Sequence, residues 1–404
     1  MKISNSKIHW FNPGHEDAIR TGSPYYTPPA SVCRMMNDLA MLPLWYGNEN
    51  DYVIVSNANE ASRFLLSLPE TIRPEVVPIM PPGFHISDPA EAAPWGLSPQ
   101  SIRFYETLPE LSENITVPLW HEKYKELTGR QTALMCLSKI QSLLPDNFNV
   151  HPIPHVCTSV EKIHQFISEY PPPYILKTPY SCAGRGLYHL LTRDLDTPAS
   201  RWIAGALKKQ GAVSIECFLD KVCDFAMEFE SDGKGNIGFK GLAVFNTLTK
   251  GIYYGNLLGS QRVIEKHLAA FIQIDHLHMI QKTISPILSE TLGYDYSGYF
   301  GVDMMVYRKD NMITIHPLVE INLRYTMGLV ALQLSNRLIY KYSRGQLVVT
   351  YNKDKNKICN FHHQLKENYP LILSGSKIQS GYLSLCPVLP DTQYLAYILV
   401  EHLY

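Results

Sequence analysis

The feature that most constrains this chain is a pair of strand-like segments that carry acids within apolar sequence. The segment Tyr299–Tyr307 contains Asp303, and the segment Met312–Ile321, expected as its hairpin partner, contains Glu320. Side chains two residues apart lie on one face of a strand, so Glu320 and Asn322 share a face that Asp303 can join. Carboxylates in such strands are costly unless a cation offsets their charge. The sequence therefore predicts a hairpin with one polar, cation-binding face.

Three oxygen-bearing side chains on neighbouring strands suit Mg²⁺, which takes a few carboxylates together with phosphate oxygens and water. We therefore predict Asp303, Glu320 and Asn322 as metal ligands. Arg324 follows at the same spacing and is expected on the same face, where a guanidinium can hold phosphate oxygens. The alternative is a buried ion pair that joins Arg324 to Glu320 or Asp303.

A candidate phosphate loop lies earlier in the chain. The predicted strand Tyr174–Lys177 ends in a lysine and is followed by the small-residue loop Ser181–Gly186, which contains Gly184. Glycines let backbone N–H groups approach phosphate oxygens, and Lys177 adds a fixed positive charge. The alternative is an ordinary hairpin with a solvated lysine.

A strand that ends in a kinked apolar stretch follows at Val213–Leu219. Such a stretch can offer backbone groups to an adenine edge and apolar side chains to its face, and Asp220 and Asp224 come after it.

The sequence Asp232-Gly-Lys-Gly235 predicts a tight hairpin turn and not a phosphate loop, because alternating strands flank it and no helix follows.

The first 120 or so residues alternate strand and helix patterns, which predicts a small α/β domain with a parallel sheet. Its strands are expected at Asp51–Ser56 and Glu75–Met80, with a helix at Asn59–Leu68 between them. Further along, Thr128–Leu144 is expected to be a helix capped by its first residue. A long helix is predicted at His267–Leu292, and about the last 60 residues show no pattern that assigns them.

The order of these features resembles the ATP-grasp superfamily, whose members include D-alanine–D-alanine ligase, biotin carboxylase and carbamoyl phosphate synthetase. The residues that carry the resemblance are Lys177 with its glycine loop, the hinge Glu216–Leu219, Asp303, and the element Glu320-x-Asn322-x-Arg324. The resemblance covers roughly residues 125–345. It implies an α/β (α+β) chain in which a preATP-grasp-like domain precedes a two-subdomain ATP-grasp fold. The implied segments are 1–125 (preATP-grasp-like), 126–211 (first subdomain with the glycine loop), 212–345 (second subdomain with the metal site) and 346–404 (unassigned extension).

The resemblance also implies residue roles. Lys177 and Arg324 are the expected catalytic charges, and Asp303, Glu320 and Asn322 are expected to hold a pair of Mg²⁺ ions, with Mn²⁺ able to substitute. The expected ATP-binding residues are Arg130, Lys177, Ser181, Gly184, Gly186, Glu216, Phe218, Leu219 and Asp224. Gly301 stands where the D-alanine ligase branch carries an arginine, which disfavours that branch.

The implied reaction is the activation of a small-molecule or peptide carboxylate as an acyl phosphate, followed by attack of an amine or another nucleophile. The candidate substrate residues are His15, Lys240, Asn256 and Arg262; surface or turn roles are the alternatives for each. Two other functions remain open, namely an ATP-grasp kinase that phosphorylates a small-molecule hydroxyl and a non-catalytic ATP-binding regulator.

Charge and composition exclude several other classes of function. The formal net charge is −1 and no long basic run occurs, which disfavours nucleic acid as a partner. No stretch reaches the roughly 18–20 apolar residues that a membrane span needs, and the N-terminus lacks the apolar core of a secretory signal. Eight scattered cysteines without CxxC pairs predict reduced thiols in a cytoplasmic protein. The sequence makes no prediction of oligomeric state.

Overall fold

The computed structural model describes residues 6–81, 84, 86, 88–108, 115–145, 148, 152–181, 186–248, 251–309 and 312–403. Of the predicted ATP-binding residues, Gly184 lies outside the described residues. The chain forms two compact units. The first unit combines Met1–His121, Tyr254–Ile264 and Arg324–Tyr404, and the second combines Glu122–Tyr253 and Glu265–Leu323.

The N-terminal part of the first unit is a parallel sheet, as the alternation of strands and helices predicted. Its strand order is β3-β2-β1-β4-β5, and every pairing in it is parallel. The strands are β1 (Ser6–Trp10), β2 (Tyr52–Ile54), β3 (Val77–Ile79), β4 (Ala90–Pro94) and β5 (Ile115–Thr116). The helices between them are α1 (His15–Thr21), α2 (Ala30–Asp38), α3 (Ala58–Ser67) and α4 (Pro99–Glu106). Two short 3₁₀ helices are η1 (Leu42–Trp45) and η2 (Glu70–Ile72).

The rest of the first unit includes residues 346–404, for which the sequence predicted no elements, and α11 (Met327–Leu338), which confirms the helix that the sequence predicted at Gly328–Tyr342. Its strands neighbour one another in the order β12-β15-β18-β17-β16, and the pairings within it are antiparallel. The elements are β12 (Tyr253–Leu258), α11 (Met327–Leu338), β15 (Ser343–Tyr351), α12 (Lys357–Asn368), β16 (Ile372–Ser374), β17 (Lys377–Ser384) and β18 (Tyr394–His402). The buried Trp45 indole donates a 2.7 Å hydrogen bond to the Leu385 carbonyl, so the two ends of the chain share one core.

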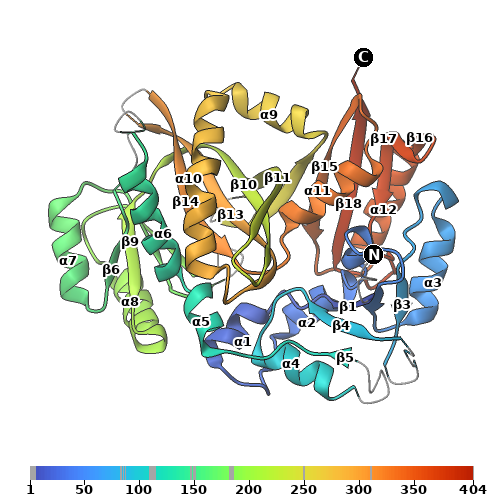
Figure 1. The fold of residues 1–404 in the computed structure, drawn as a ribbon, viewed down its shortest axis with the longest axis horizontal. Coiled ribbons are helices and arrows are strands. Elements are labelled where there is room, and N and C mark those ends of the chain that lie inside the picture. Colours follow the sequence, from blue (N-terminus) through green and yellow to red (C-terminus); the bar gives the residue numbers. More distant parts are fainter. Residues whose placement is uncertain are drawn as a thin grey trace. The chain divides into compact units, whose positions relative to one another are not determined.

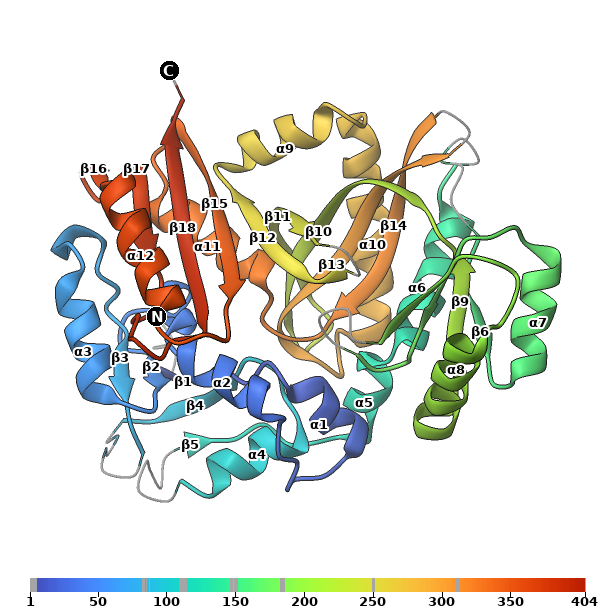
Figure 2. The ribbon, with the colours of Figure 1, turned by 180° about the vertical axis from the view of Figure 1, so that it is seen from behind.

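The second unit begins with an antiparallel sheet of order β6-β9-β7-β8, flanked by α7 and α8 (Figure 2). Its strands are β6 (His155–Cys157), β7 (Tyr174–Lys177), β8 (Leu187–Leu190) and β9 (Val213–Cys217). The helices are α5 (Glu122–Thr128), α6 (Arg130–Leu143), α7 (Val160–Glu169) and α8 (Thr197–Gln210).

Four longer strands of the second unit form the antiparallel order β14-β13-β10-β11. They are β10 (Asp220–Asp232), β11 (Ile237–Thr247), β13 (Ser297–Lys309) and β14 (Met312–Asn322). One face of β10 and β13 is apolar and buried, as Phe229, Phe300 and Val302 show. Helix α6 packs against β14 and against α10 (Ile274–Leu292) (Figure 1).

The predicted turn at Asp232–Gly235 is confirmed. Gly233 and Gly235 adopt φ values of 69° and 92°, which L-residues with side chains rarely adopt. Asp232 Oδ1 accepts the N–H groups of Lys234 and Asn236 and so stabilises the turn.

Two predicted helices are wrong in their boundaries. Thr128 does not cap a helix, because it ends α5 and its hydroxyl donates to the Tyr124 carbonyl, while α6 begins at Arg130. The predicted helix His267–Leu292 is broken, since α9 (Gln261–Ala269) stops before α10 starts at Ile274. Among the described residues, no helix combines the length and apolar character required to cross a bilayer.

A buried carboxylate anchors the C-terminal segment to the N-terminal helix α2. Asp38 Oδ2 accepts bonds from Arg34 Nε (2.9 Å) and from the backbone N–H groups of Gln393 (2.8 Å) and Tyr394 (3.0 Å). We expect Asp38→Ala to lower the free energy of unfolding by about 2–4 kcal/mol, because two shielded N–H groups lose their acceptor. Urea denaturation measures the change.

The matched control for Asp38 is Asp17, whose pair with Arg20 on α1 is more exposed. Asp17→Ala should cost less than about 1 kcal/mol. Equal losses for the two variants would contradict the anchoring role of Asp38.

Candidate functional site

The polar face of the second unit is built from β10, β13 and β14. Asp303 on β13 lies directly opposite Glu320 on β14, and Gly301 lies opposite Asn322. Residues opposite each other in a ladder share a face, so all three predicted metal ligands lie together. The Asn322 amide donates a 3.0 Å hydrogen bond from Nδ2 to Asp303 Oδ2.

Two carboxylates opposite each other destabilise a ladder unless positive charge or donors offset them. Asp303 and Glu320 are both half-buried, so water screens their repulsion only in part. Within the described residues, no group of three or more His, Cys, Asp and Glu side chains is arranged to hold a metal. A metal here would need the Asn322 amide oxygen and ligand oxygens from a nucleotide, which is the donor set that suits Mg²⁺.

Arg130 connects this pair of acids to the predicted glycine loop. Its Nη2 lies 3.2 Å from Glu320 Oε1 and 3.3 Å from Ser181 Oγ. Its Nε donates a 2.9 Å bond to the Thr178 carbonyl, just after the lysine of β7. The α6 N-terminus therefore places one guanidinium between the start of the loop and a predicted metal ligand.

Lys177 and Glu216 form an ion pair between β7 and β9. Only 13% of the Lys177 side chain and 7% of the Glu216 side chain are exposed, which rules out the alternative of a solvated lysine. Lys177, Glu216 and Arg130 line one pocket, whose other walls include Leu134, Ser214, His316 and Leu318. The predicted phosphate and hinge residues thus meet around one cavity.

The base of the glycine loop is closed too tightly for a side chain. A Cβ on Gly186 would lie 2.2 Å from Thr178 Oγ1 and 2.4 Å from Ser181 Cβ. The Gly186 carbonyl also accepts a 2.9 Å bond from the Thr178 N–H. Gly186 is therefore required for the two ends of the loop to meet.

The predicted hinge follows β9. Phe218 is exposed and Leu219 half-buried, while Asp224 Oδ2 accepts bonds from Lys221 Nζ (2.5 Å) and Thr247 Oγ1 (3.0 Å). Burial, and then the Asp224 charge, raise the pKa of the neighbouring Cys223 thiol to about 11. This thiol is protonated near neutral pH and is not an activated nucleophile.

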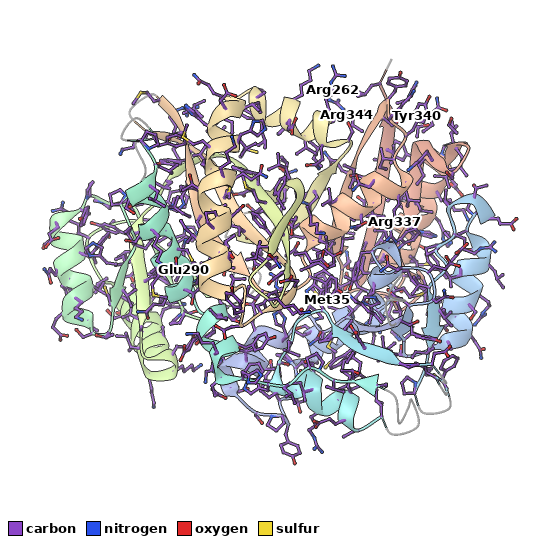
Figure 3. All side chains as sticks on the ribbon, in the orientation of Figure 1. Met35, Arg262, Glu290, Arg337, Tyr340 and Arg344 are labelled. Atoms are coloured by element: carbon purple, nitrogen blue, oxygen red, sulfur yellow. The ribbon has the colours of Figure 1, made fainter. Side chains whose placement is uncertain are left out.

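The candidate substrate residues are dispersed. Lys240 on β11 belongs to the second unit, where its Nζ lies 2.6 Å from Glu230 Oε2. Asn256 is buried within β12 of the first unit, which excludes the alternative of a turn or surface role for it. Arg262 is exposed on α9, and its side chain projects from the edge of the first unit (Figure 3).

His15 and Arg324 both belong to the first unit. Strand β14 ends at Asn322, so the strand periodicity that predicted a shared face does not extend to Arg324. The Arg324 guanidinium instead donates a 3.3 Å hydrogen bond from Nε to Oε1 of Glu16, the residue that follows His15. Within the second unit, Glu320 pairs with Arg130, and Asp303 accepts a hydrogen bond from the Asn322 amide.

Two buried polar residues at this site were not singled out from the sequence. His316 on β14 is buried and lines the pocket beside Leu318. Glu228 on β10 lies opposite Gly301, and is therefore on the face of Asp303, with only 2% of the residue exposed. For Glu228 the sequence offered no local signal, because only the pairing of β10 with β13 places it beside the predicted ligands.

Comparison with known proteins identifies the fold. No family model matches the sequence, and no curated protein matches it significantly. Biotin carboxylase from Campylobacter jejuni superposes with a TM-score of 0.55 at 11% identity, covering 99% of this chain and 88% of that chain.

Two further solved structures cover the chain in the same way. The biotin carboxylase domain of Hydrogenobacter thermophilus 2-oxoglutarate carboxylase gives a TM-score of 0.52 at 13% identity, covering 98% of this chain and 86% of that one. N5-carboxyaminoimidazole synthetase from Staphylococcus aureus gives 0.50 at 12% identity, covering 100% and 94%. The chain therefore has the ATP-grasp fold that the sequence predicted.

Proposed function

We propose that this protein is an ATP- and Mg²⁺-dependent ligase that activates a carboxylate as an acyl phosphate for attack by an amine or another nucleophile. The observation that carries the proposal is that Asp303 and Glu320 lie opposite each other with Asn322 beside them. Arg130 pairs with Glu320 and also lines the pocket of Lys177 and Glu216. Carboxylates placed in this way commonly bind the Mg²⁺ that accompanies nucleotide phosphates.

In this proposal the γ-phosphoryl group of ATP passes to a carboxylate oxygen and ADP leaves. The incoming amine then displaces inorganic phosphate from the acyl carbon. Asp303, Glu320 and Asn322 would hold Mg²⁺, which supplies positive charge to neutralise the phosphates when it is bound. Lys177 and Arg130 bind the phosphates, and Glu216 and the backbone of Phe218 and Leu219 contact the adenine.

Three structural neighbours support this assignment. The solved structures named above include an ADP complex and a complex with MgADP and bicarbonate. The four-segment division into a preATP-grasp-like domain, two ATP-grasp subdomains and a C-terminal extension belongs to the same proposal. The seven cysteines that the structure describes are free, which fits the proposed cytoplasmic location.

The experiment that tests the reaction class measures ADP release with panels of acceptors. A ligase requires a carboxylate for turnover and an amine for product release, whereas a kinase requires only a hydroxyl compound. Detection of the acyl phosphate as a hydroxamate with hydroxylamine identifies the activated carboxylate. Nucleotide binding with no turnover on any panel would instead identify a regulator.

Removing the charge of the opposed acids tests the metal site. We expect Asp303→Asn with Glu320→Gln to reduce Mg²⁺-dependent ATP turnover by at least about 100-fold, because the ligand charge that holds the cation is lost. The fold should persist, since both changes preserve shape and relieve repulsion. Steady-state ADP release and circular dichroism provide the two measurements.

The control for the metal variants is Glu290→Gln on α10 of the same unit. Glu290 is exposed and pairs with Lys139 on the surface (Figure 3). Its variant should retain wild-type turnover. Turnover that survives in the double acid variant would remove the metal assignment.

Substitution of Lys177 tests nucleotide binding, but it also affects Glu216, with which Lys177 forms an ion pair. Lys177→Met alone would leave the Glu216 charge buried and unpaired, which is itself destabilising. We therefore pair it with Glu216→Gln, and expect the dissociation constant for Mg-ATP to rise by about 10- to 100-fold. Calorimetry measures the affinity.

The single variant Glu216→Gln separates the two contributions in that experiment. It keeps the lysine and should bind Mg-ATP more tightly than the double variant does. Equal affinity for the double variant and the wild type would place the phosphate site elsewhere.

A further inference from the structure

The backbone that follows β7 belongs to no strand, yet groups from elsewhere in the second unit hold it. We call residues 178–181 the exit segment. The Thr178 N–H donates a 2.9 Å bond to the Gly186 carbonyl, and the Thr178 carbonyl accepts a 2.9 Å bond from Arg130 Nε. The Pro179 carbonyl accepts a 3.2 Å bond from the Arg130 N–H. The start of α6 therefore holds the first half of the exit segment.

Gln210 holds the next residue of the exit segment by both of its backbone groups. Gln210 Oε1 accepts a 2.9 Å bond from the Tyr180 N–H, and Gln210 Nε2 donates a 3.1 Å bond to the Tyr180 carbonyl. A residue in an antiparallel ladder exchanges the same two kinds of bond with the residue opposite it. The Gln210 amide therefore takes the place of a neighbouring strand at this point.

The chemistry of this contact requires an amide side chain. The Tyr180 N–H needs an acceptor and the Tyr180 carbonyl needs a donor. The glutamine amide presents a carbonyl oxygen and an NH₂ group side by side, whereas glutamate at neutral pH lacks the donor and lysine lacks the acceptor. Substitutions at Gln210 can therefore remove one of the two bonds or both.

Gln210 is the last residue of α8, and the fold fixes its position. Helix α8 buries Ile203 and Ala206 in a core that it shares with β7 and β9. The helix is followed by Gly211, whose φ of 77° lies in the left-handed region and whose N–H donates a 2.9 Å bond to the Leu207 carbonyl. Gln210 thus holds Tyr180 from a fixed helix end.

The exit segment connects two groups of the proposed phosphate site. Lys177 precedes the segment on β7, and Ser181 ends it, with Ser181 Oγ 3.3 Å from Arg130 Nη2. The Tyr180 side chain is also held, because its hydroxyl donates a 3.1 Å bond to the Lys125 carbonyl. Since Tyr180 and Ser181 are consecutive, a shift of the Tyr180 backbone would also move the Ser181 hydroxyl away from Arg130.

We propose that Gln210 is a positioning residue for phosphate binding, which holds the Tyr180 backbone so that Ser181 stays beside Arg130. The inference rests on the proposed function for the place of the nucleotide phosphates, and not for the reaction that follows. Contacts that are already in place cost less ordering when the ligand binds. The loss of Gln210 should therefore weaken contacts to phosphate and spare contacts to the base and the ribose.

Calorimetry on the full chain compares Mg-ATP with adenosine, which lacks phosphates. The wild type should bind Mg-ATP at least about tenfold more tightly than adenosine. Gln210→Leu removes both bonds at similar volume, and it should weaken Mg-ATP by about tenfold and leave adenosine unchanged. Gln210→Glu keeps the acceptor but places a carboxylate oxygen against the Tyr180 carbonyl, so it should weaken Mg-ATP at least as much.

Gln165 on α7 of the same unit supplies the matched control. Its side chain is exposed, and its Nε2 donates a 3.2 Å bond to Glu169 Oε1 on the same helix. Gln165→Leu should change neither affinity. Hydrogen exchange without nucleotide gives a second readout, in which Gln210→Leu should speed the exchange of the Tyr180 N–H by about tenfold and Gln165→Leu should not.

The outcomes separate this inference from the ligase proposal. Gln210→Leu that weakens Mg-ATP and adenosine equally, or changes neither, overturns the positioning role and leaves the ligase proposal standing. Adenosine that binds the wild type as tightly as Mg-ATP overturns the inference together with the phosphate site. Selective loss of Mg-ATP affinity in a protein that turns over no substrate on any panel supports the inference and refutes the ligase. Circular dichroism checks folding, and Gln210→Glu, which can keep one of the two bonds, replaces Gln210→Leu if that variant does not fold.

Discussion

The candidate site of the second unit is organised around two carboxylates, Asp303 and Glu320, that lie opposite each other on neighbouring strands. Such a pair raises the energy of the sheet when nothing offsets it. The Asn322 amide and the Arg130 guanidinium both point their donors at these acids, which lowers the cost without removing it. The apolar face of the same strands, including Phe300, fixes the register, because a slip of one residue would bury the acids and expose the core. Packing therefore maintains an arrangement that electrostatics alone would oppose.

The cations of the candidate site are also partly buried, so their charges likewise need to be offset. The two cations that we propose to bind the nucleotide phosphates are partly buried, and each is paired with an acid. These pairs are Lys177–Glu216 and Arg130–Glu320. A shielded cation needs a counter-charge before an anion arrives, and the acid also keeps the side chain in place.

Local patterns predicted the strands and the tight turn well and the helix boundaries poorly. The turn at Asp232–Gly235 is fixed by glycine conformations and an aspartate acceptor, both of which are local. The helix start at Arg130 is different, since its N–H is satisfied by the Pro179 carbonyl, 49 positions away in the sequence. A capping residue cannot be read from local sequence when the acceptor comes from another segment. The break between α9 and α10 was likewise not predicted, because no glycine or proline marks Ala270–Gln273.

The sequence by itself determined the chemistry that is available, because residue type and two-residue spacing place Glu320 and Asn322 on one strand face. The ATP-grasp fold was implied by the resemblance of these residues, in their order along the chain, to that superfamily. Only the tertiary structure decided which charges meet. It paired Arg324 with Glu16, 308 positions apart, and it placed Asp303 directly opposite Glu320. Long-range pairing depends on how strands register and how loops pack, and those are set by the whole core and not by any one segment.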